Sequence, residues 1–142
     1  MFNNTYNTNS NTADFNVSAL IDQRKTSKVQ KVEGTMYFYA PEMCKEDADT
    51  EFEAFPLDVW ALGITTYCLV YLKLPFNYNN YVDFIEKISN DDVNFPDSVN
   101  ISEGLKDLIK QMLEKNPLKR ITCKEIKRNK WLNQGKEDLE LK

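Results

Sequence analysis

The sequence predicts a mainly α-helical fold with little or no β-sheet, and three observations lead to this class. Residues 59–72 are apolar almost without interruption, and a helix that has no polar face is buried on every side. Residues 81–88 and 105–113 carry apolar side chains at every third or fourth position, which is typical of helices with one buried face. Thr122 and Glu125 form the pattern of a capping box, so another helix is expected to begin there.

Composition limits the classes of protein and of site. The chain has 142 residues, 42% of them hydrophobic, which is enough for the core of one domain or of part of one. A net charge of −4 and the lack of a basic cluster with interleaved aromatic residues argue against nucleic acid and anionic membranes as partners. There is no histidine, which excludes imidazole bases and His-ligated zinc. The cysteines Cys44, Cys68 and Cys123 are too far apart for a zinc knuckle and indicate the reduced thiols of a cytoplasmic protein.

The first segment, residues 1–12, is rich in Asn, Thr and Ser and is expected to be disordered, because it cannot bury enough apolar surface to offset the entropy of ordering. It has neither the basic nor the apolar region of a signal peptide. The longest apolar run is shorter than the about 18 residues of a membrane span, so no membrane partner is expected.

Residues 22–33 are polar, partly basic and without helical or strand periodicity, so they are expected to form a loop. Thr26 and Ser27 lie in its middle. A phosphate on either hydroxyl would add charge that can pair with a basic pocket and order the segment. The alternative is that both are ordinary loop hydroxyls, and the sequence leaves the two possibilities open.

The next stretch, residues 43–55, is acidic and lacks the spacing of a calcium-binding loop, so it is expected to be a solvated loop. Asp58 is a favoured N-cap residue and is expected to start the apolar helix of residues 59–72. Pro75 lies in the turn that ends it.

Three helices are expected after this turn. Residues 81–88 should bury the face that carries Tyr81, Phe84, Ile85 and Ile88. Ser102 should cap a second helix, whose buried face carries Leu105, Leu108, Ile109, Met112 and Leu113. The third is expected to run from the capping box at Thr122 to Trp131, and residues 133–142 to form a charged tail.

Two motifs resemble signature segments of the eukaryotic protein kinases. Residues 34–42, GTMYFYAPE, are similar to the end of the activation segment, and residues 58–63, DVWALG, to the central helix of the large lobe. Residues 13–15 are similar to the Asp-Phe-Gly motif, with Asn16 in place of glycine. The resemblance covers residues 13–132 and predicts the helical C-terminal lobe of the kinase fold. Several short phrases are most similar to the calcium/calmodulin-dependent protein kinase kinases.

The resemblance implies roles for particular residues. Asp14 would hold Mg²⁺ on the phosphates of ATP, and Gly34 and Thr35 would shape the groove for a protein substrate. Glu42 would be the buried acid of the lobe and Arg120 its partner. Because a buried carboxylate without a partner is costly, the two are expected to be in contact, and losing either should cost roughly 3–5 kcal/mol.

A working kinase also needs parts that these residues do not supply: a Gly-rich loop, a strand lysine and a catalytic loop. No residue is therefore given a catalytic role, ATP and Mg²⁺ are expected only in a complete kinase, and this chain alone is expected to be inactive. Without the helices that pack on it in kinases, one face of the apolar helix should be bare. A missing part of a longer polypeptide, or another protein that supplies the N-terminal lobe or regulation, would cover it.

Two functions follow. In the first, the chain is the C-terminal part of a Ser/Thr kinase that acts on a protein substrate. In the second, it is a non-catalytic, pseudokinase-like module that binds a protein, for which the exposed face of helix 81–88 is a candidate surface. An upstream coding sequence would distinguish them. A third alternative, chance similarity of an unrelated helical protein, conflicts with six matches in the right order. No basic amphipathic helix for calmodulin follows Trp131.

Overall fold

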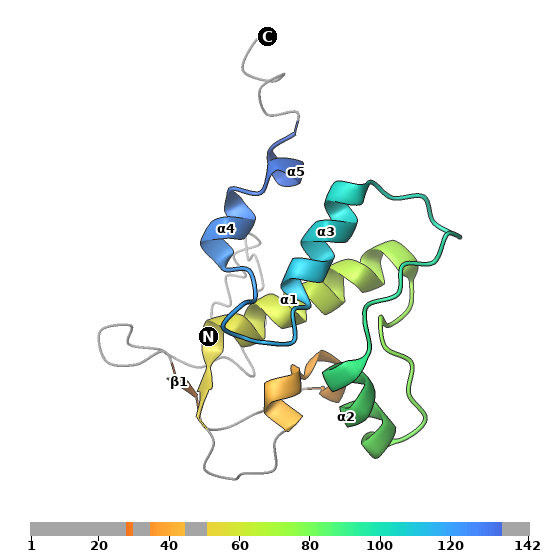
Figure 1. Cartoon of the computed structure of the whole chain (residues 1–142), viewed down its shortest axis with the longest axis vertical. Coiled ribbons are helices and arrows are strands. Elements are labelled where there is room, and N and C mark those ends of the chain that lie inside the picture. The colour runs from red at the N-terminus through yellow and green to blue at the C-terminus, as the bar shows by residue number, and fades with distance from the viewer. Residues whose placement is uncertain (1–27, 30–34, 45–50, 135–142) are drawn as a thin grey trace, which may run out of the picture.

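The structure is a computed structural model that describes residues 28–29, 35–44 and 51–134. Its elements, in order, are strand β1 (Lys28–Val29), the 3-10 helices η1 (Met36–Phe38) and η2 (Pro41–Cys44), strand β2 (Phe52–Glu53), and the helices α1 (Ala54–Tyr71), α2 (Tyr81–Asn90), α3 (Glu103–Met112), α4 (Cys123–Lys127) and α5 (Lys130–Asn133) (Figure 1). Helices dominate the described part, which confirms the predicted class. The predicted divisions 1–12, 13–132 and 133–142 stay predictions.

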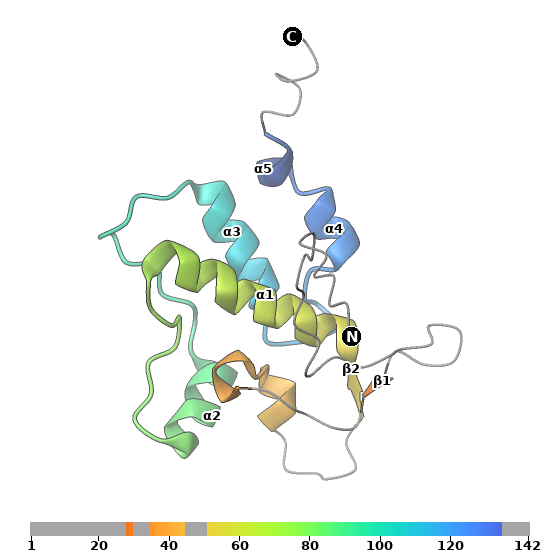
Figure 2. The same cartoon turned by 180° about the vertical axis from the view of Figure 1, so that it is seen from behind.

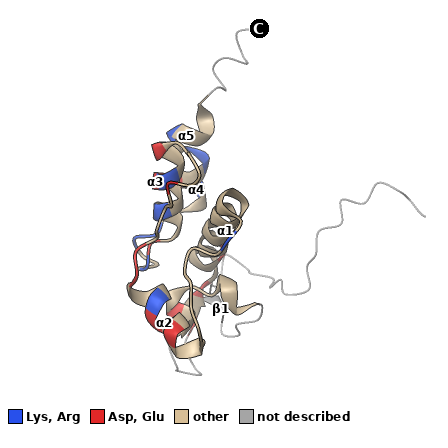
Figure 3. Ribbon diagram, turned by 90° about the vertical axis from the view of Figure 1, so that its right-hand side faces the viewer, with Lys and Arg blue, Asp and Glu red and all other residues tan. Residues whose placement is uncertain are grey.

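Helix α1 is the central element. Figures 1 and 2 show it crossing the middle of the molecule, with α3 on one side and α2 and the two 3-10 helices on the other. α1 contacts α3 and η1, α2 contacts η2, and α3 contacts α5. The only charged residue of α1 is Asp58, whereas both signs of charge occur along α2 and α3 (Figure 3).

The core lies where α1, α2 and α3 meet. Its largest fully buried side chains are Trp60, Tyr67, Phe84, Ile64, Ile88, Ile109, Met112 and Val59. Gly63 of α1 lies directly against the end of α3, because a Cβ atom built there would be 2.8 Å from Leu113 Cδ2 and 2.9 Å from Met112 Cβ. The absence of a side chain at Gly63 therefore sets how closely the two helices approach.

One side of α1 carries exposed apolar side chains in the described part of the chain. Leu69 is 76% exposed and Leu62 is 46% exposed, and Phe55 lies on the exposed side as well. The prediction that this helix is buried on every side is therefore wrong for the described part of the chain. The accompanying prediction, that an apolar face would be left uncovered, is confirmed.

α1 also has the dimensions of a membrane-spanning helix, with 18 residues and a mean hydropathy of 1.3, although no apolar run of that length was expected. The core helices of water-soluble proteins have the same length and composition. The buried side of α1 contributes Trp60, Ile64 and Tyr67 to the core. We therefore interpret α1 as a core helix.

The start of α1 corrects the prediction that Asp58 is its N-cap. The helix begins at Ala54, and Glu53 occupies the N-cap position, where its side chain does not form the capping hydrogen bond to the helix. Pro56 lies in the first turn, where backbone N–H groups have no partner within the helix and a proline is tolerated. Asp58 lies inside the helix instead.

Two predicted loops are also corrected. Lys28–Val29 pairs antiparallel with Phe52–Glu53, in the register Lys28↔Glu53 and Val29↔Phe52. Phe52 is buried although it stands in the acidic stretch 43–55. Strands of two residues are too short to produce a periodic pattern, so the sequence could not indicate them.

The later helices follow the sequence more closely. Ser102 Oγ accepts a hydrogen bond from Leu105 N at 3.3 Å, and Thr122 and Glu125 form both bonds of the capping box, so both predicted caps are confirmed. In α2, Phe84 and Ile88 are buried as predicted. Tyr81 is 54% exposed, so its predicted burial is wrong.

The last predicted helix is two helices, α4 and α5. Asn129 interrupts it, because its side-chain oxygen accepts a hydrogen bond from Trp131 N at 2.9 Å and so caps α5. Asn side chains favour such local bonds over a continuous helix. Trp131 packs against Gly104 of α3, where a Cβ atom would lie 2.9 Å from Trp131 Cδ1.

Candidate functional site

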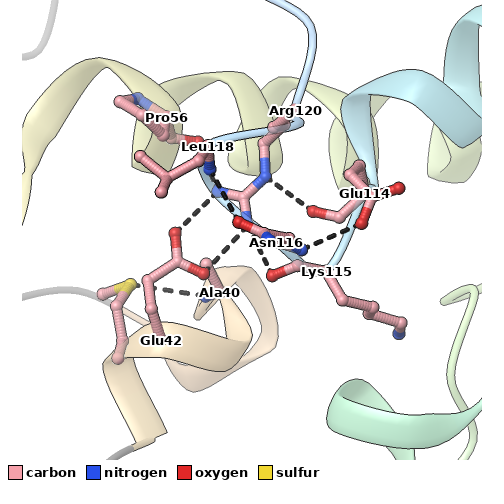
Figure 4. Close-up of polar contacts among 9 residues, drawn as sticks. Ala40, Glu42, Pro56, Glu114, Lys115, Asn116, Leu118 and Arg120 are labelled. Carbon is pink, nitrogen blue, oxygen red and sulfur yellow. Dashed lines mark hydrogen bonds and ion pairs between the residues drawn. The ribbon is translucent and has the colours of Figure 1, made fainter.

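The candidate site is built on a buried ion pair between Glu42 and Arg120 (Figure 4). Arg120 Nη1 donates to Glu42 Oε1 at 2.7 Å, and Nη2 donates to Oε2 at 2.9 Å, so the contact is bidentate. Arg120 is 4% exposed and Glu42 is 9% exposed. The contact that the sequence predicted between these two residues is confirmed.

The segment around Glu42 is held by its own short turns. Pro41 begins η2, and Met43 N donates to Ala40 O at 2.9 Å. Ala40 is fully buried, and its N–H points to Met43 Sδ at 3.3 Å (Figure 4). These turns direct the carboxylate of Glu42 inward, toward the beginning of α1 and the connection between α3 and α4.

Arg120 is held by backbone oxygens as well. Its Nε donates to Glu114 O at 2.9 Å, and Nη1 also donates to Pro56 O at 2.7 Å. Asn116 shapes the turn before it: Asn116 Oδ1 accepts from Leu118 N, and Asn116 O from Arg120 N, both at 3.0 Å. One guanidinium thus joins η2, the first turn of α1 and the α3–α4 connection.

Aromatic rings lie beside this pair. The Arg120 guanidinium carbon is 5.0 Å from the centre of the Trp60 ring, and Trp60 stacks on Phe76 at 6.1 Å. Lys115 Nζ lies 4.0 Å from the centre of the Phe76 ring and donates to Ile88 O at 2.6 Å. Burial lowers the pKa of Lys115 to about 8.

Cys44 ends η2 and is buried. Burial, with a smaller contribution from the charge of Glu42, raises the pKa of its thiol to about 11. A thiol with a raised pKa stays protonated near neutral pH and is a poor nucleophile. Cys44 is therefore a packing residue of this site.

The structure tests few of the other predicted sites. Thr35 is exposed and occupies the N-cap position of η1. Asp14, Thr26, Ser27 and Gly34 lie outside the described residues, so their magnesium, phosphate-acceptor and substrate roles stay predictions.

The segment after Thr35 presents aromatic side chains that sequence reasoning did not assign to the site. Tyr37 is 46% exposed, and the centre of its ring lies 6.0 Å from that of Tyr78. Tyr78 in turn packs edge-on against Phe84 of α2, at 4.9 Å. The contacts of these rings link three separate segments, and no local pattern in the sequence reports them.

Within the described ranges, no group of three or more Cys, Asp or Glu side chains could hold a metal ion. The one residue that the kinase resemblance offers as a magnesium ligand, Asp14, is outside them.

A family model described as "Protein kinase domain" matches residues 2–132. The chain is 36% identical over 134 residues to the serine/threonine-protein kinase ssp1 of Schizosaccharomyces pombe. That match covers 90% of this chain and 21% of that protein. SNF1-activating kinase 1 of Saccharomyces cerevisiae is 33% identical over 156 residues, covering 85% of this chain and 14% of that protein.

The calcium/calmodulin-dependent protein kinase kinase of Caenorhabditis elegans is 38% identical over 99 residues. That match covers 70% of this chain and 18% of that protein. The chain therefore spans about a fifth, or less, of the length of these three relatives.

Proposed function

Because this chain belongs to the protein kinase family, we propose that it is the C-terminal part of the catalytic domain of a serine/threonine protein kinase. A complete enzyme of this kind transfers the γ-phosphate of ATP to Ser or Thr hydroxyls of a protein substrate. The observation that carries the proposal is the buried pair of Glu42 and Arg120, which ties the segment ending in Ala-Pro-Glu to the central helix.

The proposed substrate-facing segment is residues 34–38. Its described part, residues 35–38, lies just before the buried Ala40 and Glu42, so the ion pair fixes the position of this part from one side. Thr35, Tyr37 and Phe38 are all exposed. An exposed segment held on a rigid base suits the binding of an extended peptide.

We propose that this chain alone does not transfer phosphate. Phosphoryl transfer depends on positioning and on charge stabilisation by a phosphate-binding loop, a lysine, metal ligands and a catalytic-loop Asp. The 142 residues contain no histidine, hence no His-Arg-Asp loop, and their four glycines are scattered. ATP and Mg²⁺ would be bound by the complete domain, to which Asp14 would contribute a metal ligand.

The bare face of α1 supports this assignment. It carries Leu62 and Leu69, and Leu72, which follows the last residue of the helix, is 91% exposed. Exposed apolar surface of this kind marks a place where other protein packs. We propose that an earlier part of the same kinase domain covers it.

The first test uses the purified chain with labelled ATP and a generic protein substrate. We expect no incorporation of phosphate. Incorporation that is also seen with Asp14→Asn would contradict the assigned metal role or reveal a contaminating kinase. Incorporation that depends on Asp14 would overturn the proposal that the chain alone is inactive.

The second test maps the 5′ end of the transcript and expresses the longest open reading frame. We expect an upstream catalytic loop joined in frame, and phosphoserine or phosphothreonine in the substrate. Asp14→Asn in this longer protein should abolish the activity. A longer protein with a catalytic loop but without activity would argue against the enzyme assignment.

The finer assignment is to the calcium/calmodulin-dependent protein kinase kinase group. It is supported by the similarity to the Caenorhabditis elegans protein over 99 residues and by phrases such as LDVWALG at residues 57–63. A cytoplasmic location is part of the same proposal, and fractionation of cells that express a tagged full-length protein would test it.

A second candidate function is a non-catalytic interaction module. The observation that favours it is the start of α2, where Tyr81 is 54% and Val82 is 73% exposed. If the transcript begins at Met1 and the chain is soluble by itself, this function is preferred over the first.

A further inference from the structure

Lys115 makes a contact that neither the kinase resemblance nor the proposed function assigns. It follows α3, and its Nζ donates a hydrogen bond of 2.6 Å to the backbone oxygen of Ile88, 27 residues earlier in the chain. Ile88 lies in the last turn of α2, where carbonyl groups have no N–H partner within the helix. The lysine therefore satisfies a helix end from a distant segment.

The same amine is bounded by two aromatic rings. Its Nζ lies 4.0 Å from the centre of Phe76 and 5.4 Å from the centre of Trp60. These rings are stacked with an interplanar angle of 7°. Trp60 also faces the guanidinium of Arg120, so the lysine and the buried ion pair share one ring.

The charges around Lys115 have opposite effects on its pKa. Burial lowers the pKa to about 8, and the charge of Arg120 acts in the same direction. Asp91 and Asp92, which follow α2, and Glu114 act against this lowering. The faces of the two aromatic rings also favour the charged amine.

We propose that Lys115 is a tertiary cap of α2, which fixes the C-terminal end of this helix against Trp60 and so fixes α2 relative to the segment that carries Glu42. The second step follows because α2 packs directly on η2 (Figure 2). The cap is inferred from these contacts alone and does not rest on the proposed function.

The cap has a pH dependence whose sign follows from linkage. When the end of α2 opens, Lys115 returns to water and to a pKa near 10.5, whereas in the closed state the pKa is about 8. The closed state then binds fewer protons than the open state between these values. The backbone amides of α2 should therefore be better protected from hydrogen exchange as the pH rises from 8 toward 10.5. The cap persists in this range, because a neutral amine can still donate a hydrogen bond to Ile88 O.

The experiment compares hydrogen exchange of the amides of α2 and α3 in the chain and in three variants. Lys115→Met keeps an apolar side chain but removes the donor, and exchange at the C-terminal end of α2 should become about tenfold faster, with α3 changed less. Lys115→Arg keeps a donor and a permanent charge, so it should retain most of the protection. Lys110→Met is the matched control, since Lys110 lies 5.5 Å from one ring, Phe95, on the exposed side of α3.

The pH profile separates a titrating cap from simple packing. After correction for intrinsic exchange, the α2-specific rise in protection above pH 8 should occur in the wild type and in Lys110→Met, and should be absent from Lys115→Arg. If Lys115→Met does not fold, the comparison of the wild type with Lys115→Arg decides. Equal acceleration in α2 and α3, or identical pH profiles for wild type and Lys115→Arg, would overturn the proposal. Neither readout requires kinase activity, so its failure is distinct from failure of the proposed function.

Discussion

The buried pair of Glu42 and Arg120 allows a quantitative prediction. Glu42→Ala removes two hydrogen bonds, of 2.7 and 2.9 Å, to a guanidinium that is 4% exposed. The guanidinium keeps its bonds to Pro56 O and Glu114 O, so it is left without a countercharge but not without acceptors. Breaking a buried pair costs roughly 3–5 kcal/mol, and this partial compensation places Glu42→Ala at about 3 kcal/mol.

Arg120→Met should cost more, about 4–5 kcal/mol, for a reason that is visible in the same contacts. It leaves the Glu42 carboxylate buried without its two donors, and it also deprives Pro56 O and Glu114 O of theirs. The double variant should cost less than the sum of the two single changes by about 2 kcal/mol, because the second substitution removes a charge that the first left unpaired.

The measurement is urea unfolding of the four proteins, followed by circular dichroism and by the fluorescence of Trp60 and Trp131. The matched control is the pair Glu103–Lys106, whose 2.8 Å contact is similarly short but lies at the surface. Lys106→Ala should cause no comparable loss, because solvent screens exposed pairs. A change below about 1 kcal/mol for Glu42→Ala, or strict additivity in the double variant, would refute the reasoning.

Four further predictions follow from close contacts and from burial. Gly63→Ala should destabilise the protein although alanine favours helices, because its Cβ atom would meet Leu113 Cδ2 at 2.8 Å; chemical unfolding measures this, and greater stability would contradict it. Gly104→Ala should displace Trp131 and shift its emission, whereas an unchanged spectrum would contradict the packing. Exposed Cys123 should react with a thiol reagent well before buried Cys44. Because the pKa of the Cys44 thiol rises from 9.0 to about 11 on folding, its contribution to stability should be present below pH 9 and lost as the pH rises through 11. Chemical unfolding at several pH values measures this loss, which should be smaller in Cys44→Ala.

The sequence predicted the features that local chemistry determines. The caps at Ser102 and Thr122 depend on residues within three positions, so their patterns are complete in the sequence. The contact of Glu42 with Arg120 was predicted for a different reason, since the two are far apart in the chain. Only the similarity of the flanking motifs to the kinase family indicated that contact.

The features that sequence analysis missed depend on tertiary context. Asp58 is a favoured cap by its residue type, but Pro56 and the preceding strand β2 allow the helix to begin at Ala54. Lys115 stands in a polar stretch that indicates only a turn. Its role arises from Ile88 and the aromatic rings, which come from other segments, and no local pattern brings these together.

The two sides of α1 differ in a way that bears on what the chain is. On one side, next to Trp60, the described part of the chain buries a charged pair, whose guanidinium also donates to the backbone oxygens of Pro56 and Glu114. On the other side, Leu62 and Leu69 remain exposed. Apolar burial is the main favourable term in folding, so a helix face that leaves large apolar side chains in solvent marks a place where other protein packs. The packed side of α1 and its exposed leucines are what a lobe shows when further protein covers the exposed side, and this supports the proposal that the chain is part of a larger kinase domain.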